Sequence, residues 1–389
     1  MHILHVVGAR PNFIKAAPVL RALAQHNQIR QTLVHTGQHY DAAMSDVFFR
    51  QLEMPEPDVN LEVGSGSHAQ QTAAVMSAFE AVLLDRKPDL VLVYGDVNST
   101  VAAALVCAKL GVRVGHVEAG LRSGDRSMPE EINRLLTDQL SDLLFTPSAD
   151  GDENLLREGI DAAKIHRVGN VMIDTLVRML PLAENCAPVN LTPPYALVTL
   201  HRPSNVDDLP WLRELLAALA ELSGQMQVIF PVHPRTRQRL NDLGAAHEAA
   251  VDETNSRLRL MDPLPYLEFL ALERRAALVI TDSGGIQEET TFLGVPCLTV
   301  RENTERPITI RMGSNQLVGR DVKKLRTAAE ALLRRVPTTG NAQKPCVPLW
   351  DGHAAQRIAQ IIVRTSASSG PTGEARGVSV FTASRWRRS

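Results

Sequence analysis

Short apolar runs alternate with segments of helical spacing over most of the chain. Each run is rich in Val, Ile and Leu and spans three to six residues, which is typical of buried strands. Most runs are followed by about 10–15 residues in which apolar positions recur with a helical period. This alternation predicts parallel sheets with helices on both faces. The predicted strands are Ile3–Val7, Gln31–Thr36, Leu90–Tyr94, Arg113–Val117, Asp142–Thr146, Lys164–Val168, Ala196–Leu200, Gln227–Val232, Arg257–Met261, Ala277–Thr281, Pro296–Val300 and Gln316–Val318.

The number of predicted strands favours two domains. Most sheets hold about 4–6 strands, so twelve strands predict an α/β fold of two doubly wound, Rossmann-like domains. Between Asp174 and Pro194 the chain has several prolines and no strand pattern, which predicts the break between the domains. The predicted division is a first domain over 1–173, a second over 174–350, a terminal helix over 351–364, and a disordered tail over 365–389.

Charge and hydropathy exclude several classes of protein. The 41 basic and 43 acidic residues nearly balance, whereas a nucleic-acid-binding protein usually has a strong basic excess. No apolar stretch reaches the roughly 18 residues expected of a membrane-spanning helix. The N-terminal residues lack the features of a signal peptide, so we expect a cytoplasmic protein. The four cysteines are scattered and predict free thiols.

Polar residues follow the strands of the first half. In open α/β sheets ligands bind at the carboxyl ends of the strands. Arg10 and Lys15 follow the first strand, Asp96 the third and Glu118 the fourth, and Glu130 lies in the Pro129-Glu130-Glu131 segment that begins a helix. Each carboxylate has a structural alternative: a helix cap for Asp96, a paired loop carboxylate for Glu118, and an acidic first turn for Glu130. Their gathering at one sheet edge favours a catalytic site.

The second half repeats this arrangement. Its strongest motif is Asp282-Ser283-Gly284-Gly285, where glycines and a helix N-terminus suit a phosphate; a tight strand-to-helix turn is the alternative. Glu289, within the next two turns, has the reach to accept both hydroxyls of a ribose. The further candidates after strands are His201, Arg202, His233 and Arg306.

Other motifs give no support for a bound cofactor. Gly64-Ser65-Gly66-Ser67-His68-Ala69 fits a loose dinucleotide pattern, but it does not follow the first strand and is interpreted as a surface loop. HExxH, GxSxG and P-loop motifs are absent, and the His116-Val117-Glu118 segment lacks the PCxxC of zinc deaminases. We therefore predict no metal and no nicotinamide cofactor.

Taken together, these residues resemble one family, the non-hydrolysing UDP-N-acetylglucosamine 2-epimerases. The resemblance covers residues 1 to about 363 in nine ordered blocks. The blocks are GARPNFIK, HTGQHYD, VYGDVNST, GHVEAGLRSG, MPEEINR, LHRPSNVDD, FPVHPRT, TDSGGIQEE and RENTERP. The resemblance implies a GT-B architecture with a nucleotide in the cleft between the domains and a C-terminal helix that returns to the first domain. It also implies a UDP-sugar substrate and a homodimer.

Several positions depart from common forms of the family. They include Asn12 in the first block, Met128 before Pro129, and the Pro203-Ser204-Asn205 loop. The MPEEIN and HTGQHYD forms also occur in the branch that epimerises UDP-2,3-diacetamido-glucuronic acid, which is the alternative substrate. Some members bind a second substrate molecule as activator, and Gln38-His39 lies where that site would be.

The implied reaction needs acid–base groups and cations. Inversion at C2 requires either oxidation or elimination, because the C2 proton is scarcely acidic, and only elimination of UDP to 2-acetamidoglucal suits the residues present. Asp96, Glu118 and Glu130 would supply base, acid and charge stabilisation. Arg10, Lys15 and His201 would hold the phosphates over the backbone of Ser283, Gly284 and Gly285. Three rivals remain: a GT-B glycosyltransferase, a hydrolysing epimerase and a non-enzymatic UDP-sugar sensor.

Overall fold

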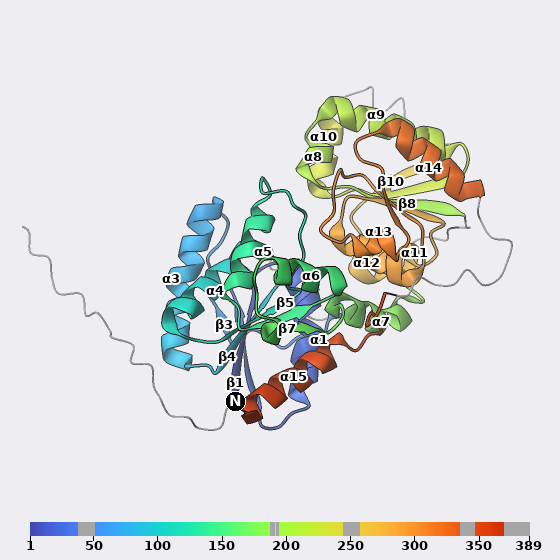
Figure 1. Cartoon of the computed structure of the whole chain (residues 1–389). Helices are drawn as coiled ribbons and strands as arrows, with labels where there is room; N and C mark the ends of the chain where they lie inside the picture. The colour runs from blue at the N-terminus through green and yellow to red at the C-terminus, as the bar shows by residue number, and fades with distance from the viewer. Residues whose placement is uncertain (38–50, 187–190, 192–193, 244–256, 335–346, 369–389) are drawn as a thin grey trace, which may run out of the picture.

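The chain folds into two α/β domains, each built on a sheet of parallel strands (Figure 1). The computed structural model describes residues 1–37, 51–186, 191, 194–243, 257–334 and 347–368. The first sheet has seven parallel strands in the order β3-β2-β1-β4-β5-β6-β7. Its strands are β1 (His2–Val7), β2 (Arg30–His35), β3 (Val59–Asn60), β4 (Leu90–Tyr94), β5 (Val114–Val117), β6 (Leu143–Thr146) and β7 (Ile165–Arg167).

The second sheet has six parallel strands in the order β10-β9-β8-β11-β12-β13. They are β8 (Tyr195–Thr199), β9 (Gln227–Pro231), β10 (Leu258–Met261), β11 (Leu278–Thr281), β12 (Cys297–Thr299) and β13 (Asn315–Leu317). All twelve predicted strands are confirmed, with ends that differ by at most one residue. Among the strands of the described residues, only the two-residue β3 was not predicted, because it is short and pairs at the sheet edge.

Helices cover both sheets. Those of the first half are α1 (Arg10–Ala24), α3 (His68–Arg86), α4 (Asn98–Leu110), α5 (Pro129–Leu140), α6 (Ala149–Arg157) and α7 (Val171–Ala183), with a short 3₁₀ helix over Ala162–Lys164. Those that follow are α8 (Pro203–Val206), α9 (Leu209–Ser223), α10 (Pro234–Asp242), α11 (Tyr266–Glu273), α12 (Gly284–Leu293), α13 (Ile308–Arg311), α14 (Val322–Arg334) and α15 (Ala354–Ser368). No helix in the described ranges is long and apolar enough to cross a membrane.

Helix α7 runs across the predicted boundary at residue 174. It packs on α1 and α15 of the first domain and also contacts α11 and α12 of the second. Pro181 lies in its last turns without ending it there, so the predicted break begins inside a helix. Because α7 packs against both domains, the connection between them begins as an ordered helix rather than as a loose linker.

Helix α15 returns to the first domain and lies beside α1 (Figure 1). The Asp174 carboxylate accepts hydrogen bonds from the Ala354 and Ala355 backbone N–H groups at 3.0 and 2.7 Å, which satisfies the start of the helix. The predicted disordered tail is wrong at its beginning, because Thr365–Ser368 continue this helix; its remainder, 369–389, lies outside the described residues.

Candidate active site

An ionic junction joins the two domains at the carboxyl ends of their strands. Arg306 of the second domain donates to Glu118 of the first, with Nη2 and Oε1 3.3 Å apart. The Glu118 carboxylate also accepts from Lys15 Nζ, and all three side chains are buried. Lys15 and Glu118 are 103 positions apart in sequence and meet because β1 and β5 both end at this edge. The structure thus brings three of the predicted site residues, Lys15, Glu118 and Arg306, together at this edge.

The backbone at Glu118 is unusual for a residue with a side chain. Its φ is +76°, in the region that favours glycine. Such a conformation costs on the order of 1–3 kcal/mol and is common at functional sites. In this conformation the carboxylate accepts from Lys15 directly after β5 ends.

A buried histidine–aspartate pair supports this turn. The His116 ring links the Asp138 carboxylate, 2.6 Å from Nδ1, to the Gly95 carbonyl, 2.8 Å from Nε2. Asp138 also accepts from the Gly120 backbone N–H at 3.1 Å. Burial alone would raise the pKa of Asp138, but His116 and Arg122 together lower it, so the carboxylate stays ionised.

Replacing Gly120 by alanine should damage this turn. Gly120 has φ +81°, and an added Cβ would lie 2.4 Å from the Gly151 carbonyl oxygen. We expect a loss of at least about 2 kcal/mol in the free energy of unfolding, measured by urea denaturation. Gly124→Ala is the matched control, because Gly124 has φ +74° with nothing within 4 Å of an added Cβ. Equal losses in the two variants would contradict a role for close packing at Gly120.

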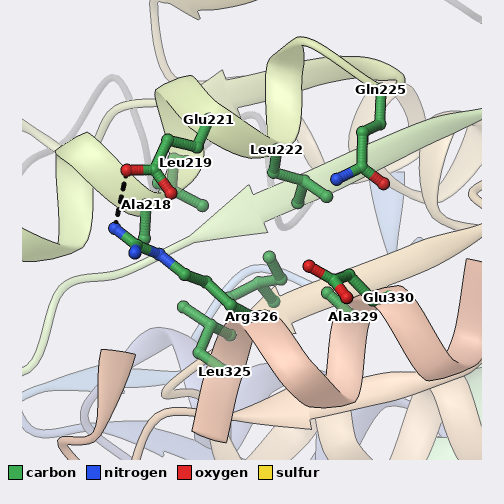
Figure 2. A pocket seen from close by; sticks show the side chains of 10 residues that line it. Ala218, Leu219, Glu221, Leu222, Gln225, Leu325, Arg326, Ala329 and Glu330 are labelled. Atoms are coloured by element: carbon green, nitrogen blue, oxygen red, sulfur yellow. Dashed lines mark hydrogen bonds and ion pairs between the residues drawn. The ribbon is translucent and has the colours of Figure 1, made fainter. Parts of the chain in front are cut away.

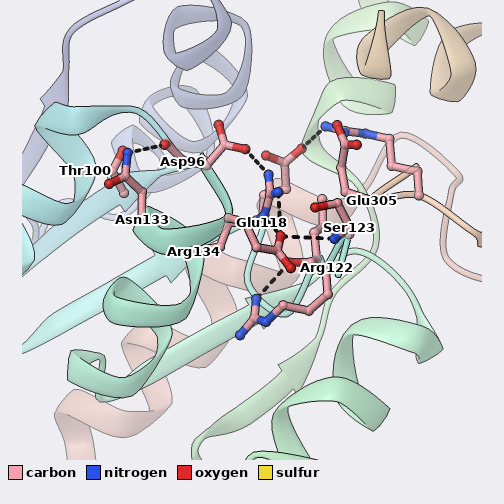
Figure 3. A network of polar contacts seen from close by, with 12 residues as sticks. Asp96, Thr100, Glu118, Arg122, Ser123, Asn133, Arg134 and Glu305 are labelled. Carbon is pink, nitrogen blue, oxygen red and sulfur yellow. Dashed lines mark hydrogen bonds and ion pairs between the residues drawn. The ribbon is translucent and has the colours of Figure 1, made fainter. Parts of the chain in front are cut away.

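Asp96 belongs to a second polar network beside the junction (Figure 3). Arg134 of α5 donates to the Asp96 carboxylate, and Asn133 donates to the Asp96 carbonyl oxygen at 2.9 Å. Arg134 also donates to Glu131, whose carboxylate accepts from the Gly124 backbone at 2.9 Å. Asp96 is therefore held by a cation, whereas the N-cap position of α4 is occupied by Val97.

Glu130, the predicted catalytic residue, is exposed, whereas the next residue, Glu131, is buried and carries the contacts just described. Burial alone would raise the pKa of Glu131, but the Ser123 backbone N–H and Arg134 outweigh it and hold that pKa below its usual range. The structure thus leaves Glu130 outside the ionic network, and its catalytic role stays a prediction.

In the second domain, Arg306 is surrounded by carboxylates. Beside its contact to Glu118, its Nε lies 2.9 Å from Glu288 Oε1 and its Nη1 lies 2.5 Å from Glu305 Oε1. Glu305 also pairs with Arg301 at 2.7 Å, and the guanidinium of Arg202 lies 3.6 Å from it. Each guanidinium of this cluster faces at least one carboxylate, and an arriving diphosphate would compete with these carboxylates for the guanidinium groups.

Glu288 has a perturbed acidity. Burial, together with the charge of nearby Glu118, raises its pKa to about 7 against the lowering effect of Arg306. Between about pH 4.5 and 7 the folded state therefore keeps a proton that the unfolded chain has lost. The contribution of Glu288 to the free energy of unfolding falls as pH rises through this window.

A comparison with Glu288→Gln would measure this effect. The unfolding free energy of the parent minus that of the variant should fall as pH rises from about 5 to about 8, because the amide does not titrate. Urea denaturation at each pH provides the measurement. A difference that stays constant, or that grows with pH, would show that Glu288 has an ordinary or lowered pKa.

His201 and His233 lie near each other after β8 and β9. Their ring centroids are 5.9 Å apart. His201 Nδ1 is 3.0 Å from the Asp282 carboxylate, which also accepts from the backbone N–H of Arg202 at 2.9 Å. His233 caps α10 by accepting from the Arg235 backbone. The structure thus gathers His201, Arg202 and His233 at one edge of the second sheet.

The Ser283-Gly284-Gly285 segment forms the start of α12, as predicted. The Ser283 side chain makes no cap hydrogen bond, so its hydroxyl is not used to close the helix. A Cβ at Gly284 would lie 2.4 Å from Arg306 Nη1. Glycine there lets the guanidinium approach the helix N-terminus, which places a cation and free backbone N–H groups side by side.

The ribose candidate Glu289 lies in a setting that the sequence did not predict. Glu289 is buried, and its Oε1 accepts from the Tyr266 hydroxyl at 2.8 Å; its role toward a ribose stays a prediction. Arg10 begins α1, but its side chain lies outside the described part, as does the Gln38-His39 segment. Glu131, Arg134, Glu288 and Glu305 were not among the sequence candidates.

Concavities elsewhere lie away from this junction. One of about 40 Å³ lies between α9 and α14, where Arg326 pairs with Glu221 at 2.8 Å (Figure 2). Another of about 510 Å³ lies between α1, α7 and α15, with Arg21 and Arg178 in its wall. In the described ranges no three His, Cys, Asp or Glu side chains are grouped to hold a metal ion.

Comparison with known proteins agrees with this fold. The family model described as UDP-N-acetylglucosamine 2-epimerase matches residues 21–363. A UDP-N-acetylglucosamine 2-epimerase of Methanococcus maripaludis is 42% identical over 366 residues, 92% of this chain and 97% of that protein. A UDP-2,3-diacetamido-2,3-dideoxy-D-glucuronate 2-epimerase of Pseudomonas aeruginosa is 42% identical over 369 residues, 94% of this chain and 100% of that protein.

Solved structures show the same architecture. The Methanocaldococcus jannaschii UDP-GlcNAc 2-epimerase in complex with UDP-GlcNAc and UDP has a TM-score of 0.83 and 42% identity, covering 94% of this chain and all of that one. The Neisseria meningitidis enzyme bound to UDP-GlcNAc has a TM-score of 0.81 and 32% identity, covering 95% of this chain and all of that one. The fold class is thus a two-domain α/β enzyme of GT-B architecture. The chain belongs to the UDP-N-acetylglucosamine 2-epimerase family and is an isomerase.

Proposed function

We propose that this enzyme interconverts UDP-N-acetylglucosamine and UDP-N-acetylmannosamine by inversion at C2. The observation that carries the proposal is the contact of Arg306 with Glu118, which joins a cation beside a phosphate-type helix start to a carboxylate of the other domain. Relatives named for this activity, at 42% identity over nearly their whole length, support it. We further propose that the enzyme is a homodimer, that it acts in the cytoplasm, and that its product is a precursor of bacterial surface polysaccharide.

The proposed chemistry is elimination and re-addition. A carboxylate takes the C2 proton, the C2–H electron pair forms the C1–C2 double bond, and the C1–O bond breaks with its electrons leaving on UDP. The product pair is UDP and 2-acetamidoglucal. Protonation of C2 from the opposite face, with return of UDP to C1, completes the inversion.

Roles follow from the position of each group. Glu118 is the buried carboxylate of the junction, and Asp96 is a half-buried carboxylate beside it. These two are the candidates for base and acid. Lys15 and Arg306, which contact Glu118, would stabilise the charge that develops on the departing diphosphate. His201 would assist the leaving group from the second domain.

The nucleotide would lie mainly on the second domain. The backbone of Ser283, Gly284 and Gly285 would bind the phosphates at the start of α12. The cations proposed to assist there are Arg10, Arg202 and His233. Glu289 would accept the ribose hydroxyls. The proposed reaction needs no metal and no nicotinamide.

Incubation with UDP-N-acetylglucosamine in D₂O tests the proposal. NMR should show deuterium entering C2 while the manno isomer accumulates, because the C2 proton exchanges through a carboxylate. Release of free sugar and UDP would identify a hydrolysing enzyme. Transfer to an added acceptor without C2 exchange would identify a glycosyltransferase, and binding without turnover a sensor.

The alternative candidate for the substrate is UDP-2,3-diacetamido-2,3-dideoxy-glucuronic acid. The Pseudomonas aeruginosa relative named for that sugar matches this chain at 42% identity, as do the relatives named for UDP-N-acetylglucosamine. Turnover of the two UDP-sugars compared at equal concentration decides between them. A kcat/KM at least ten times higher for the uronate would reassign the substrate and leave the reaction unchanged.

A further inference from the structure

Glu273 is a buried carboxyl group that the ionic junction does not use. It is the last residue of α11 and has no exposed surface. Within the described part of the chain, neither of its carboxyl oxygens has a donor as partner when the group is ionised. The Glu289 carboxyl of α12 lies within hydrogen-bond reach of it and is also buried. Two acidic side chains therefore face each other inside the second domain.

This pair differs from the other buried carboxylates of the site. Each of the others has a Lys, Arg or His side chain as partner; these are Glu118, Glu131, Asp138, Asp282, Glu288 and Glu305. Among the described residues, no Lys, Arg or His forms an ion pair with Glu273 or Glu289. The negative charge of the pair can then be lowered by protonation of one of the two carboxyl groups.

The groups facing the pair are neutral. Tyr266 of α11 donates to Glu289 Oε1, and Cys297 of β12 lies near Glu273. Burial raises the pKa of both Tyr266 and Cys297, so neither supplies a charge. Burial, and then the charge of Glu289, raises the pKa of Glu273 well above its usual range. Two carboxyl groups in such a place hold one proton between them.

We propose that Glu273 is a positioning residue, whose protonated carboxyl donates to Glu289 and keeps that carboxylate ionised and aimed at the ribose hydroxyls of UDP. The Tyr266 hydroxyl is the second fixed donor to the same carboxylate. Glu289 then keeps its remaining lone pairs for the two hydroxyls of the nucleotide. The inference rests on the proposed function, because it assumes that a uridine nucleotide binds here.

Ribose selectivity is the measurement that reports on this arrangement. Calorimetric titration compares the affinity of the whole enzyme for UDP with that for 2′-deoxy-UDP. The parent should prefer UDP by about ten-fold or more, the usual worth of a hydrogen bond to a charged group. Glu273→Gln should keep this preference, since the amide N–H₂ donates in the same place. Glu273→Leu should reduce it to about two-fold, because Glu289 then takes up the proton and accepts hydroxyls weakly.

Infrared difference spectra give a second readout that does not depend on the leucine variant folding. At about pH 8, above the pKa of about 7 for Glu288, the parent minus Glu273→Gln spectrum should show the C=O band of a buried carboxylic acid. Absence of that band, or a folded leucine variant that keeps the parent's ribose preference, would overturn the inference alone. A parent that does not bind UDP would instead contradict the proposed function.

Discussion

Replacing Glu118 by glutamine should lower turnover by about 10²–10⁴-fold while the affinity for UDP stays within a few-fold of the parent. The amide keeps the shape of the side chain but removes both its charge and its capacity to transfer a proton, and a positioned acid or base contributes about that much. Asp96→Asn should have an effect of the same order, since Asp96 lies in the network of Arg134 beside the junction. Rates of C2 exchange provide the measurement.

Glu130→Gln tests the sequence prediction against the geometry. Glu130 is exposed, and Glu131 makes the buried contacts. A loss in Glu130→Gln comparable to that in Glu118→Gln would mean that α5 brings Glu130 to the sugar when substrate binds. Ser283→Ala is the contrasting control and should weaken UDP binding itself. If Asp96, Glu118 and Glu130 all tolerate amides with near-parent turnover, the proposed chemistry at this edge is wrong.

Replacing Arg306 by methionine should cost about 3–5 kcal/mol in the free energy of unfolding, because removal of one partner leaves buried charge uncompensated. Glu305 keeps Arg301 and Glu118 keeps Lys15, but Glu288 loses the cation at 2.9 Å. Urea denaturation measures the loss, and UDP titration should show weaker binding in the same variant.

A double variant separates the effect of Arg306 on stability from its effect on UDP binding. In Arg306→Met with Glu288→Gln, the uncharged amide no longer demands a cation, so part of the stability should return while UDP binding stays weak. Arg306→Lys should fall between parent and methionine, because an ammonium cannot reproduce the fork of a guanidinium. A loss below about 1 kcal/mol in Arg306→Met would show that the cluster is open to solvent.

The sheets and the junction follow from rules that need only local pattern and strand order. Runs such as Leu90–Tyr94 are continuous and apolar because parallel strands are buried on both faces, so their limits were predictable to one residue. Parallel strands bring their carboxyl ends to one edge, which predicts the meeting of Lys15 with Glu118 across the sequence.

Which of two adjacent acidic residues faces inward was not predictable. Neighbours on a helix point about 100° apart, so the choice between Glu130 and Glu131 depends on the face that α5 packs. On α12 both Glu288 and Glu289 are buried, and which partners each meets depends in the same way on packing. Glu273 belongs to no motif, and only the packing of α11 on its neighbours shows that it is buried. Such positions depend on tertiary contacts, which single-sequence patterns do not contain.

The return of α15 to the first domain has a consequence for synthesis on the ribosome. Ile358 and Ile362 of that helix belong to the same apolar core as Leu20 and Leu23 of α1. The N-terminal domain is thus discontinuous in sequence, and its core stays incomplete until the last helix has left the exit tunnel. The second domain, contiguous between its first and last strands, is free to fold earlier. A nascent chain arrested before residue 354 should therefore expose the α1 surface to chaperones and proteases even after the second domain is native.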